Sequence, residues 1–155
     1  MSELPEAVIF DVDGTLCDVR SIRHLVAGPR RDFHSFHMRS VDCPPNEEVK
    51  EAAHHARQVG RAVIVVTARM ECYRHVTSMW LALNQIPSDA LYMRRDGDFR
   101  KDFLVKREIL AKIRRRWNPV HAWDDNPEVI ALWQQENIEC TVVPGWDDRI
   151  GKGEK

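Results

Sequence analysis

Short apolar, β-branched runs alternate along the chain with longer segments in which apolar residues recur at helical spacing. The expected strands cover residues 7–11, 62–67, 90–93, 120–124 and 140–143. The expected helices cover residues 46–59, 72–84, 102–116 and 127–136. Strands that alternate with helices of this length predict a parallel sheet with helices on both faces. We therefore expect an α/β fold, a three-layer sandwich around a five-stranded, mainly parallel sheet.

One segment interrupts this alternation. Residues 17–45, between the first expected strand and its helix, are too long for an ordinary connection, and loops of this size are usually lids or binding loops. The segment is rich in basic side chains, which are Arg20, Arg23, His24, Arg30, Arg31, His34, His37 and Arg39. We expect residues 1–155 to form one domain in which this segment is a lid over the end of the first strand. A solvated surface loop is the alternative.

The first expected strand ends in an acid pair within Asp11-Val12-Asp13-Gly14-Thr15. Carboxyl ends of parallel strands form the ligand crevice, so Asp11 and Asp13 should point into it. Gly14 allows a sharp turn and a close approach of the backbone to a phosphate, and Thr15 adds a hydroxyl. One carboxylate could act as nucleophile and the other as proton donor and acceptor, provided a divalent cation neutralises the charge. A simple turn after a core strand would not require both acids.

Polar side chains also follow the second and fourth expected strands. Thr67 can hydrogen-bond a phosphoryl oxygen, and the amides of Ala68 and Arg69 add positive potential, although a threonine here is also a common cap or turn residue. Asp124 and Asp125 stand before a proline that marks a helix start. A helix N-cap explains one of these two acids but not both.

Together these oxygens predict a hard metal site. Asp11, the main-chain carbonyl of Asp13, and the Asp124-Asp125 pair suit Mg²⁺ better than zinc or copper, and either Asp124 or Asp125 could be the direct ligand. Lys106 lies on the helix before the fourth strand and would offset the charge of a nucleophile and of phosphoryl oxygens. Taken alone, Lys106 is better explained as an exposed helix residue.

The order of these groups, an acid pair, a threonine, a lysine and a second acid pair, resembles the haloacid dehalogenase-like (HAD) phosphohydrolases over nearly the whole chain. The resemblance implies a Rossmann-like sheet with a small cap or lid inserted after the first strand. It also implies that Asp11 attacks phosphorus to form an aspartyl-phosphate while Asp13 serves as acid and base. Mg²⁺ would bridge Asp11 and the phosphoryl group, and Thr67 and Lys106 would bind its oxygens.

A closer resemblance is to the 3′-phosphatase domain of bacteriophage polynucleotide kinase, which removes a 3′-terminal phosphate from DNA or RNA. It lies in residues 11–16, 100–110, 124–133 and 138–140. The block that begins Arg100-Lys101-Asp102 is the most discriminating, and Asp102 would match a functional acid of that domain. The resemblance thus implies that Arg100 and Asp102 contact the substrate.

The chain departs from that domain in two ways. No GxxxxGK[ST] loop occurs in the 155 residues, so this chain is not expected to phosphorylate 5′ ends, which leaves room for a separate kinase or ligase partner. The resemblance implies that two arginines bind equatorial phosphoryl oxygens. The one that follows the first motif is spaced differently here, with Arg20 the preferred match and Arg23 the alternative. Arg69 matches the arginine after the second motif directly.

Charge bears on the substrate. The chain is nearly neutral, with 23 Lys and Arg against 24 Asp and Glu, but residues 94–116 hold ten basic residues and four acids. This stripe could follow a nucleic-acid backbone with a steep salt dependence, or could simply complement a helix C-terminus. A 3′-terminal phosphate of DNA or RNA is the favoured substrate. A small-molecule phosphatase, for example of nucleotides, is the alternative, and a non-catalytic nucleic-acid-binding module is less favoured.

Other features bound the cellular setting. The four cysteines are scattered without a CxxC pair, which favours a reducing compartment over a disulfide framework or a zinc site. No apolar run is long enough to span a membrane, and no charged-then-apolar leader opens the chain. We therefore expect a cytoplasmic protein without a membrane partner.

Overall fold

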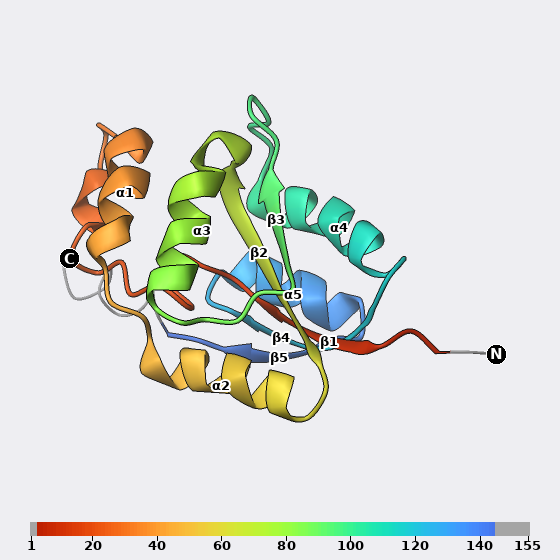
Figure 1. The fold of residues 1–155 in the computed structure, drawn as a ribbon. Coiled ribbons are helices and arrows are strands. Elements are labelled where there is room, and N and C mark those ends of the chain that lie inside the picture. Colours follow the sequence, from red (N-terminus) through yellow and green to blue (C-terminus); the bar gives the residue numbers. More distant parts are fainter. Residues whose placement is uncertain (1–2, 145–155) are drawn as a thin grey trace.

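A single parallel sheet forms the centre of the molecule in the computed structural model, which describes residues 3–144 (Figure 1). Its strands are β1 (Glu6–Phe10), β2 (Ala62–Met70), β3 (Ala90–Arg94), β4 (Asn118–Asp124) and β5 (Glu139–Val142). The spatial order is β3-β2-β1-β4-β5, and every neighbouring pair is parallel. The α/β prediction is confirmed, and the sheet is wholly rather than mainly parallel.

Two pairs of helices cover the two faces of this sheet. Helices α2 (Glu47–Gln58) and α3 (Arg74–Leu83) pack on one face, and α4 (Asp102–Ile113) and α5 (Pro127–Gln135) on the other (Figure 1). Alternate β1 residues face opposite layers, so Phe10 joins the core under α2 and α3 whereas Ile9 joins the core under α4 and α5. This double burial explains why the strands are apolar throughout, and the predicted three-layer sandwich is confirmed.

Element boundaries differ from the predictions mainly at β2, at the start of α3 and at the end of α4. Strand β2 continues to Met70, and its pairing with β3 shifts register between Thr67 and Met70. The expected helix 72–84 consists of a 3₁₀ turn, η3 (Glu71–Tyr73), followed by α3. Helix α4 ends at Ile113, three residues earlier than expected.

Residues 17–45 contain a helix that the periodicity did not predict. Helix α1 (Phe33–Arg39) lies between two 3₁₀ turns, η1 (Arg23–Leu25) and η2 (Ser40–Asp42). Asp32 caps α1, because its side chain accepts hydrogen bonds from the main-chain N–H and the hydroxyl of Ser35 at 3.0 and 2.7 Å. Seven residues are too few to show a helical repeat, so the cap is the only local signal. That this segment acts as a lid stays a prediction.

Within residues 3–144 the helices are short or polar, and none meets the length and hydropathy that a membrane-spanning helix requires.

Candidate active site

The carboxyl ends of β1, β2 and β4 open into a cavity of about 890 Å³, which α1 and the loop between β3 and α4 also border. Most of the predicted site residues line it, namely Asp11, Asp13, Thr67, Ala68, Arg69, Arg100, Asp102, Lys106, Asp124 and Asp125. Strand pairing brings the two acid pairs together, because the main-chain N–H of Asp11 donates to the carbonyl of Trp123 at 3.1 Å. The sheet therefore assembles groups that are more than a hundred residues apart in the chain.

Four charged side chains, those of Asp11, Lys106, Asp124 and Asp125, form what we call the charged floor of the cavity. Lys106 lies at its centre. Its Nζ donates to Asp11 Oδ1 at 2.8 Å and to Asp124 Oδ2 at 3.0 Å, and the residue is 2% exposed. Burial by itself would lower the pKa of this ammonium, but the charges of both carboxylates raise the pKa above its ordinary value. The lysine is therefore held as a cation, and the exposed helix residue that its local sequence suggested is not observed.

Three buried carboxylates meet at one point of the cavity. Oxygens of Asp11, Asp124 and Asp125 all lie within 4.8 Å of one another. Burial raises the pKa of Asp11 well above its usual range; Lys106 opposes this shift, and the two neighbouring aspartates add to it. When all three acids are ionised, three negative charges face the single positive charge of Lys106, and the excess of two matches a divalent cation. The all-oxygen donor set likewise fits Mg²⁺.

The second acid pair is not a helix cap. The side chain of Asn126 caps α5 by accepting from the main-chain N–H of Glu128 at 3.0 Å. Asp124 Oδ1 instead accepts from the main-chain N–H groups of Asp125 and Asn126 at 2.9 and 3.1 Å. Thr15 joins both acid pairs, because its hydroxyl lies 3.1 Å from Asp11 Oδ2 and 3.3 Å from Asp125 Oδ1. Both aspartates therefore belong to the charged floor.

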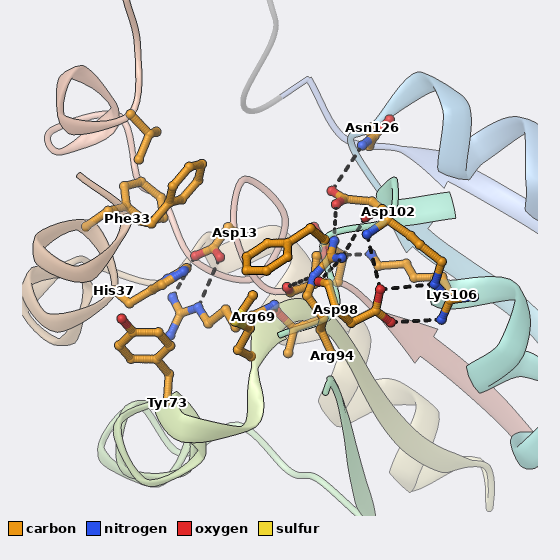
Figure 2. Close-up of a pocket in the computed structure, with 18 of the residues that line it drawn as sticks. Asp13, Phe33, His37, Arg69, Tyr73, Arg94, Asp98, Asp102, Lys106 and Asn126 are labelled. Carbon is orange, nitrogen blue, oxygen red and sulfur yellow. Dashed lines mark hydrogen bonds and ion pairs between the residues drawn. The ribbon is translucent and has the colours of Figure 1, made fainter. Parts of the chain in front are cut away.

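Asp13 has a different partner from Asp11. Arg69 donates to both carboxylate oxygens, from Nη2 at 2.6 Å and from Nε at 3.0 Å, and it is itself 2% exposed (Figure 2). Further donations to Ser40 and Thr77 fix the guanidinium. Burial would raise the pKa of Asp13, but the charge and hydrogen bonds of Arg69 hold it below the ordinary value. Arg69 thus holds the second acid, and its contact with phosphate stays a prediction.

Arg94 is a site residue that the sequence suggested only as part of a basic stripe. It is 8% exposed and donates to Asp102 Oδ1 at 2.6 Å. It also donates to the carbonyls of Ala68, Asp98 and Arg100 at 2.8, 2.9 and 2.6 Å. Arg94 therefore ties the loop before α4 to the end of β2 and holds Asp102 at the cavity. An arginine that ends an apolar strand is the signal that could have singled it out.

Several predicted contacts lie away from this cavity. Arg20 is paired with Asp18 through Nε at 2.9 Å and Nη2 at 2.6 Å, and Gly14 and Arg20 line a second cavity of about 450 Å³. Gly14 adopts the left-handed conformation that its turn requires, with φ 83°. Arg23 is buried in η1, and neither Arg20 nor Arg23 lines the cavity at Asp11. Their phosphate contacts stay predictions.

The fold and this arrangement of strand-end groups define the class of HAD-like phosphatases, because the order of motifs along the chain and their meeting point on the sheet agree. A family model for the polynucleotide kinase PNKP phosphatase domain matches residues 5–146. The chain belongs to this family, which places it among the HAD-like phosphoric monoester hydrolases.

Similar proteins extend this comparison. A protein of Autographa californica nuclear polyhedrosis virus, named as a bifunctional polynucleotide kinase/RNA ligase, is 29% identical over 140 residues, which cover 88% of this chain. A chain of the Pnkp1/Rnl/Hen1 RNA repair complex superposes with a TM-score of 0.78 at 32% identity, covering 90% of this chain. A class C acid phosphatase from Bacillus anthracis has a TM-score of 0.69 at 12% identity over 94% of this chain and 69% of that chain, and shares the fold.

The chain spans only part of the first two relatives. It covers 19% of the viral protein and 42% of the chain from the repair complex.

Proposed function

We propose that this protein is a Mg²⁺-dependent polynucleotide 3′-phosphatase that acts through an aspartyl-phosphate. The observation that carries the proposal is the separation of the two motif acids. Asp11 contacts Lys106 and clusters with Asp124 and Asp125, whose carboxylates could hold a metal ion. Asp13 instead pairs with Arg69. This separation supports a division of roles in which one acid attacks phosphorus and the other donates and accepts protons.

In the first step, a carboxylate oxygen of Asp11 forms a bond to phosphorus and the bond to the sugar oxygen breaks. Asp13 gives its proton to that leaving oxygen. In the second step, Asp13 takes a proton from water, whose oxygen attacks phosphorus and releases inorganic phosphate and free Asp11. Lys106 holds Asp11 in place, and Thr67 is within the same cavity to bind a phosphoryl oxygen.

Asp13 must gain a proton before it can act as an acid, yet Arg69 lowers its pKa. A dianionic phosphoryl group would compete with Asp13 for the N–H donors of Arg69. Weakening that pair raises the pKa of Asp13, so substrate binding itself would prepare the acid. This couples the proposed phosphate contact of Arg69 to its observed contact with Asp13.

The metal would be held by Asp11, Asp124 or Asp125, and the main-chain carbonyl of Asp13. When bound, Mg²⁺ neutralises charge between the nucleophile and the phosphoryl oxygens. The donor chemistry and the excess negative charge of this cluster support the assignment.

Three findings support a nucleic-acid 3′ end as the substrate. The family is named for polynucleotide kinase, and the viral relative and the repair-complex chain described above carry polynucleotide or RNA-repair names. The cavity also exceeds what a phosphoryl group alone requires and suits a whole nucleotide. A free nucleotide would fit as well, so a small-molecule phosphatase is the second candidate. A separate kinase or ligase partner is part of the proposal, because the relatives join these activities by name.

The first prediction tests this assignment with oligonucleotides. In the presence of Mg²⁺, phosphate release is measured from matched DNA and RNA strands ending in 3′-phosphate, 5′-phosphate or 2′,3′-cyclic phosphate, and from a free nucleotide. We expect release from 3′-phosphate ends and a loss of at least about 1000-fold in Asp11→Asn. Asp42→Asn, an exposed acid on η2, is the matched control and should keep full activity. Release from the free nucleotide alone would establish the second candidate instead.

A further inference from the structure

The cavity has an aromatic wall beside its charged floor. Figure 2 shows Phe33, His37 and Tyr73 gathered on one side of Asp13 and Arg69, opposite the groups that surround Lys106. The rings touch one another, with centroids 4.6 Å apart for His37 and Tyr73 and 6.2 Å apart for Phe33 and His37. These rings come from α1 and η3, which border the cavity.

The wall is uncharged at neutral pH. Burial lowers the pKa of His37 to about 4; the negative charge of Asp13 opposes this shift, and the positive charge of Arg69 adds to it. His37 is therefore a neutral ring beside the charged floor. Such a surface suits a flat, weakly polar ligand group better than a second phosphate.

A further aromatic residue of the same cavity, Phe99, lies on the loop before α4. It lines the cavity and is 86% exposed, and Phe33 is 51% exposed. Two exposed apolar rings that line one cavity give it an apolar surface of the kind that marks a ligand-binding groove.

The loop that carries Phe99 is firmly held although the ring is exposed. Arg94 donates to the carbonyls of Asp98 and Arg100, on either side of Phe99. The side chain of Asp96 accepts from the main-chain N–H of Cys72 at 2.9 Å and ties the loop to η3. Arg100 in turn grips the Asp98 carboxylate with Nε and Nη2 at 3.0 and 2.8 Å. The backbone at Phe99 is therefore held in place at the cavity.

We propose that Phe33 and Phe99, together with the His37–Tyr73 pair, bind the nucleobase of the terminal nucleotide whose 3′-phosphate occupies the charged floor. This inference rests on the proposed function. Only one sugar separates a 3′-phosphate from its base. When the phosphate is bound at the charged floor, the base must therefore lie against another wall of the same cavity. Every nucleobase has a flat face that stacks on aromatic rings, which makes such a surface tolerant of sequence.

The proposal also predicts a preference among ends. A base held by the wall is withdrawn from its neighbours, so single-stranded and frayed 3′ ends should react better than blunt duplex ends.

The test compares two oligonucleotide 3′-phosphates that differ only in the terminal nucleotide, which either carries its base or is abasic. For the wild-type protein we expect the substrate with the base to have a kcat/KM about 10- to 100-fold higher, mainly through KM. Phe99→Ala and Phe33→Ala should each reduce this ratio about tenfold, whereas Phe99→Trp should retain it. Leu83→Ala, an exposed apolar residue on α3 outside the cavity, is the control and should leave the ratio unchanged.

A binding measurement gives a readout without turnover. In Asp11→Asn, a terminal 2-aminopurine should lose fluorescence on binding, and adding Phe99→Ala should restore its emission. Equal kcat/KM values for the two substrates, with no effect of Phe99→Ala, would overturn the base-binding wall while 3′-phosphatase activity stands. Failure to hydrolyse any oligonucleotide 3′-phosphate would instead overturn the proposed function.

Discussion

The two acids of the first motif differ because each has a different cation. Lys106 links Asp11 to Asp124, so Asp11 belongs to the buried acidic cluster that it forms with Asp124 and Asp125. Arg69 grips Asp13 with two donors, and its own burial makes that carboxylate its necessary counter-charge. At the residue scale, the chemistry of the motif is therefore set by partners that lie far away in the chain.

The second prediction concerns the stability contributed by Asp13. Asp13→Asn leaves the buried guanidinium of Arg69 without its counter-charge and should lower the free energy of unfolding by about 2–3 kcal/mol at pH 7, below the full value for a buried pair because Asp13 is partly exposed. The pKa of Asp13 is lowered in the folded state, so this contribution is present above the unfolded pKa of about 3.9 and is lost as pH falls through the folded value.

Urea unfolding of both proteins between pH 7 and pH 3 measures this effect. The difference between them should be constant near neutrality and shrink below about pH 4. A difference that grows on acidification would contradict the assignment of the pair.

At the element scale, α1 is a short helix that its N-terminal cap stabilises. Asp32 accepts two hydrogen bonds from Ser35, and the helix has seven residues, too few to be stable alone. Since Phe33, Phe36 and His37 line the cavity from this helix, its formation determines the shape of one side of the site.

The third prediction uses this cap. Asp32→Ala should fray α1 and raise KM for an oligonucleotide 3′-phosphate several-fold. The change in kcat should be smaller, because the charged floor is built from other elements. Asp32→Asn is the matched control, since asparagine caps helices as well as aspartate does. Steady-state kinetics measure both. If Asp32→Ala lowers kcat while KM stays the same, α1 does not shape substrate binding.

The fourth prediction concerns the ends of β1 and β4, where the acidic cluster forms. Mg²⁺ should raise the unfolding temperature of the wild-type protein, with a stabilisation of about 2.7 kcal/mol at a free concentration about 100 times the dissociation constant. A variant with both Asp124→Asn and Asp125→Asn should lose this response, and the single variants show which aspartate is the direct ligand. Thermal unfolding with EDTA and with added Mg²⁺ measures it. A response retained in the double variant would place the metal elsewhere.

For the whole molecule, the charge distribution is more local than the sequence suggested. Several cations of the basic segment are already paired within the protein: Arg94 with Asp102, Arg100 with Asp98 and Glu108, and Arg114 with Glu136. The arginines that follow α4 lie near the amino-terminal end of β4, away from the cavity. We therefore predict that substrate binding does not depend on a long basic track along α4.

The fifth prediction follows from this charge pattern. The logarithm of the apparent affinity for a single-stranded 3′-phosphate should fall against the logarithm of salt concentration with a slope of only about −1, which corresponds to one or two phosphate contacts. Reversing charge with Arg115→Glu and Arg116→Glu should leave that slope unchanged. Titrations of the Asp11→Asn protein at several salt concentrations measure it. A slope of about −4 or steeper would restore the basic stripe as the path of the nucleic acid.

The sequence by itself determined the fold class and most of the residues that line the candidate site. Hydrophobic periodicity is a local property, so it located five strands and four helices within a few residues. The parallel arrangement then required Asp11, Thr67 and Asp124 to meet at one edge of the sheet, because all strands end on the same side.

Only the tertiary structure decided which cationic side chain pairs with which carboxylate, and how far each of these side chains is buried. Lys106 looked like an exposed helix residue, and nothing local paired Arg69 with Asp13 or placed Arg94 behind Asp102. Such pairs join residues that the chain does not bring together until the sheet has formed. Their hydrogen bonds and burial depend on long-range packing, which no short pattern of residues records.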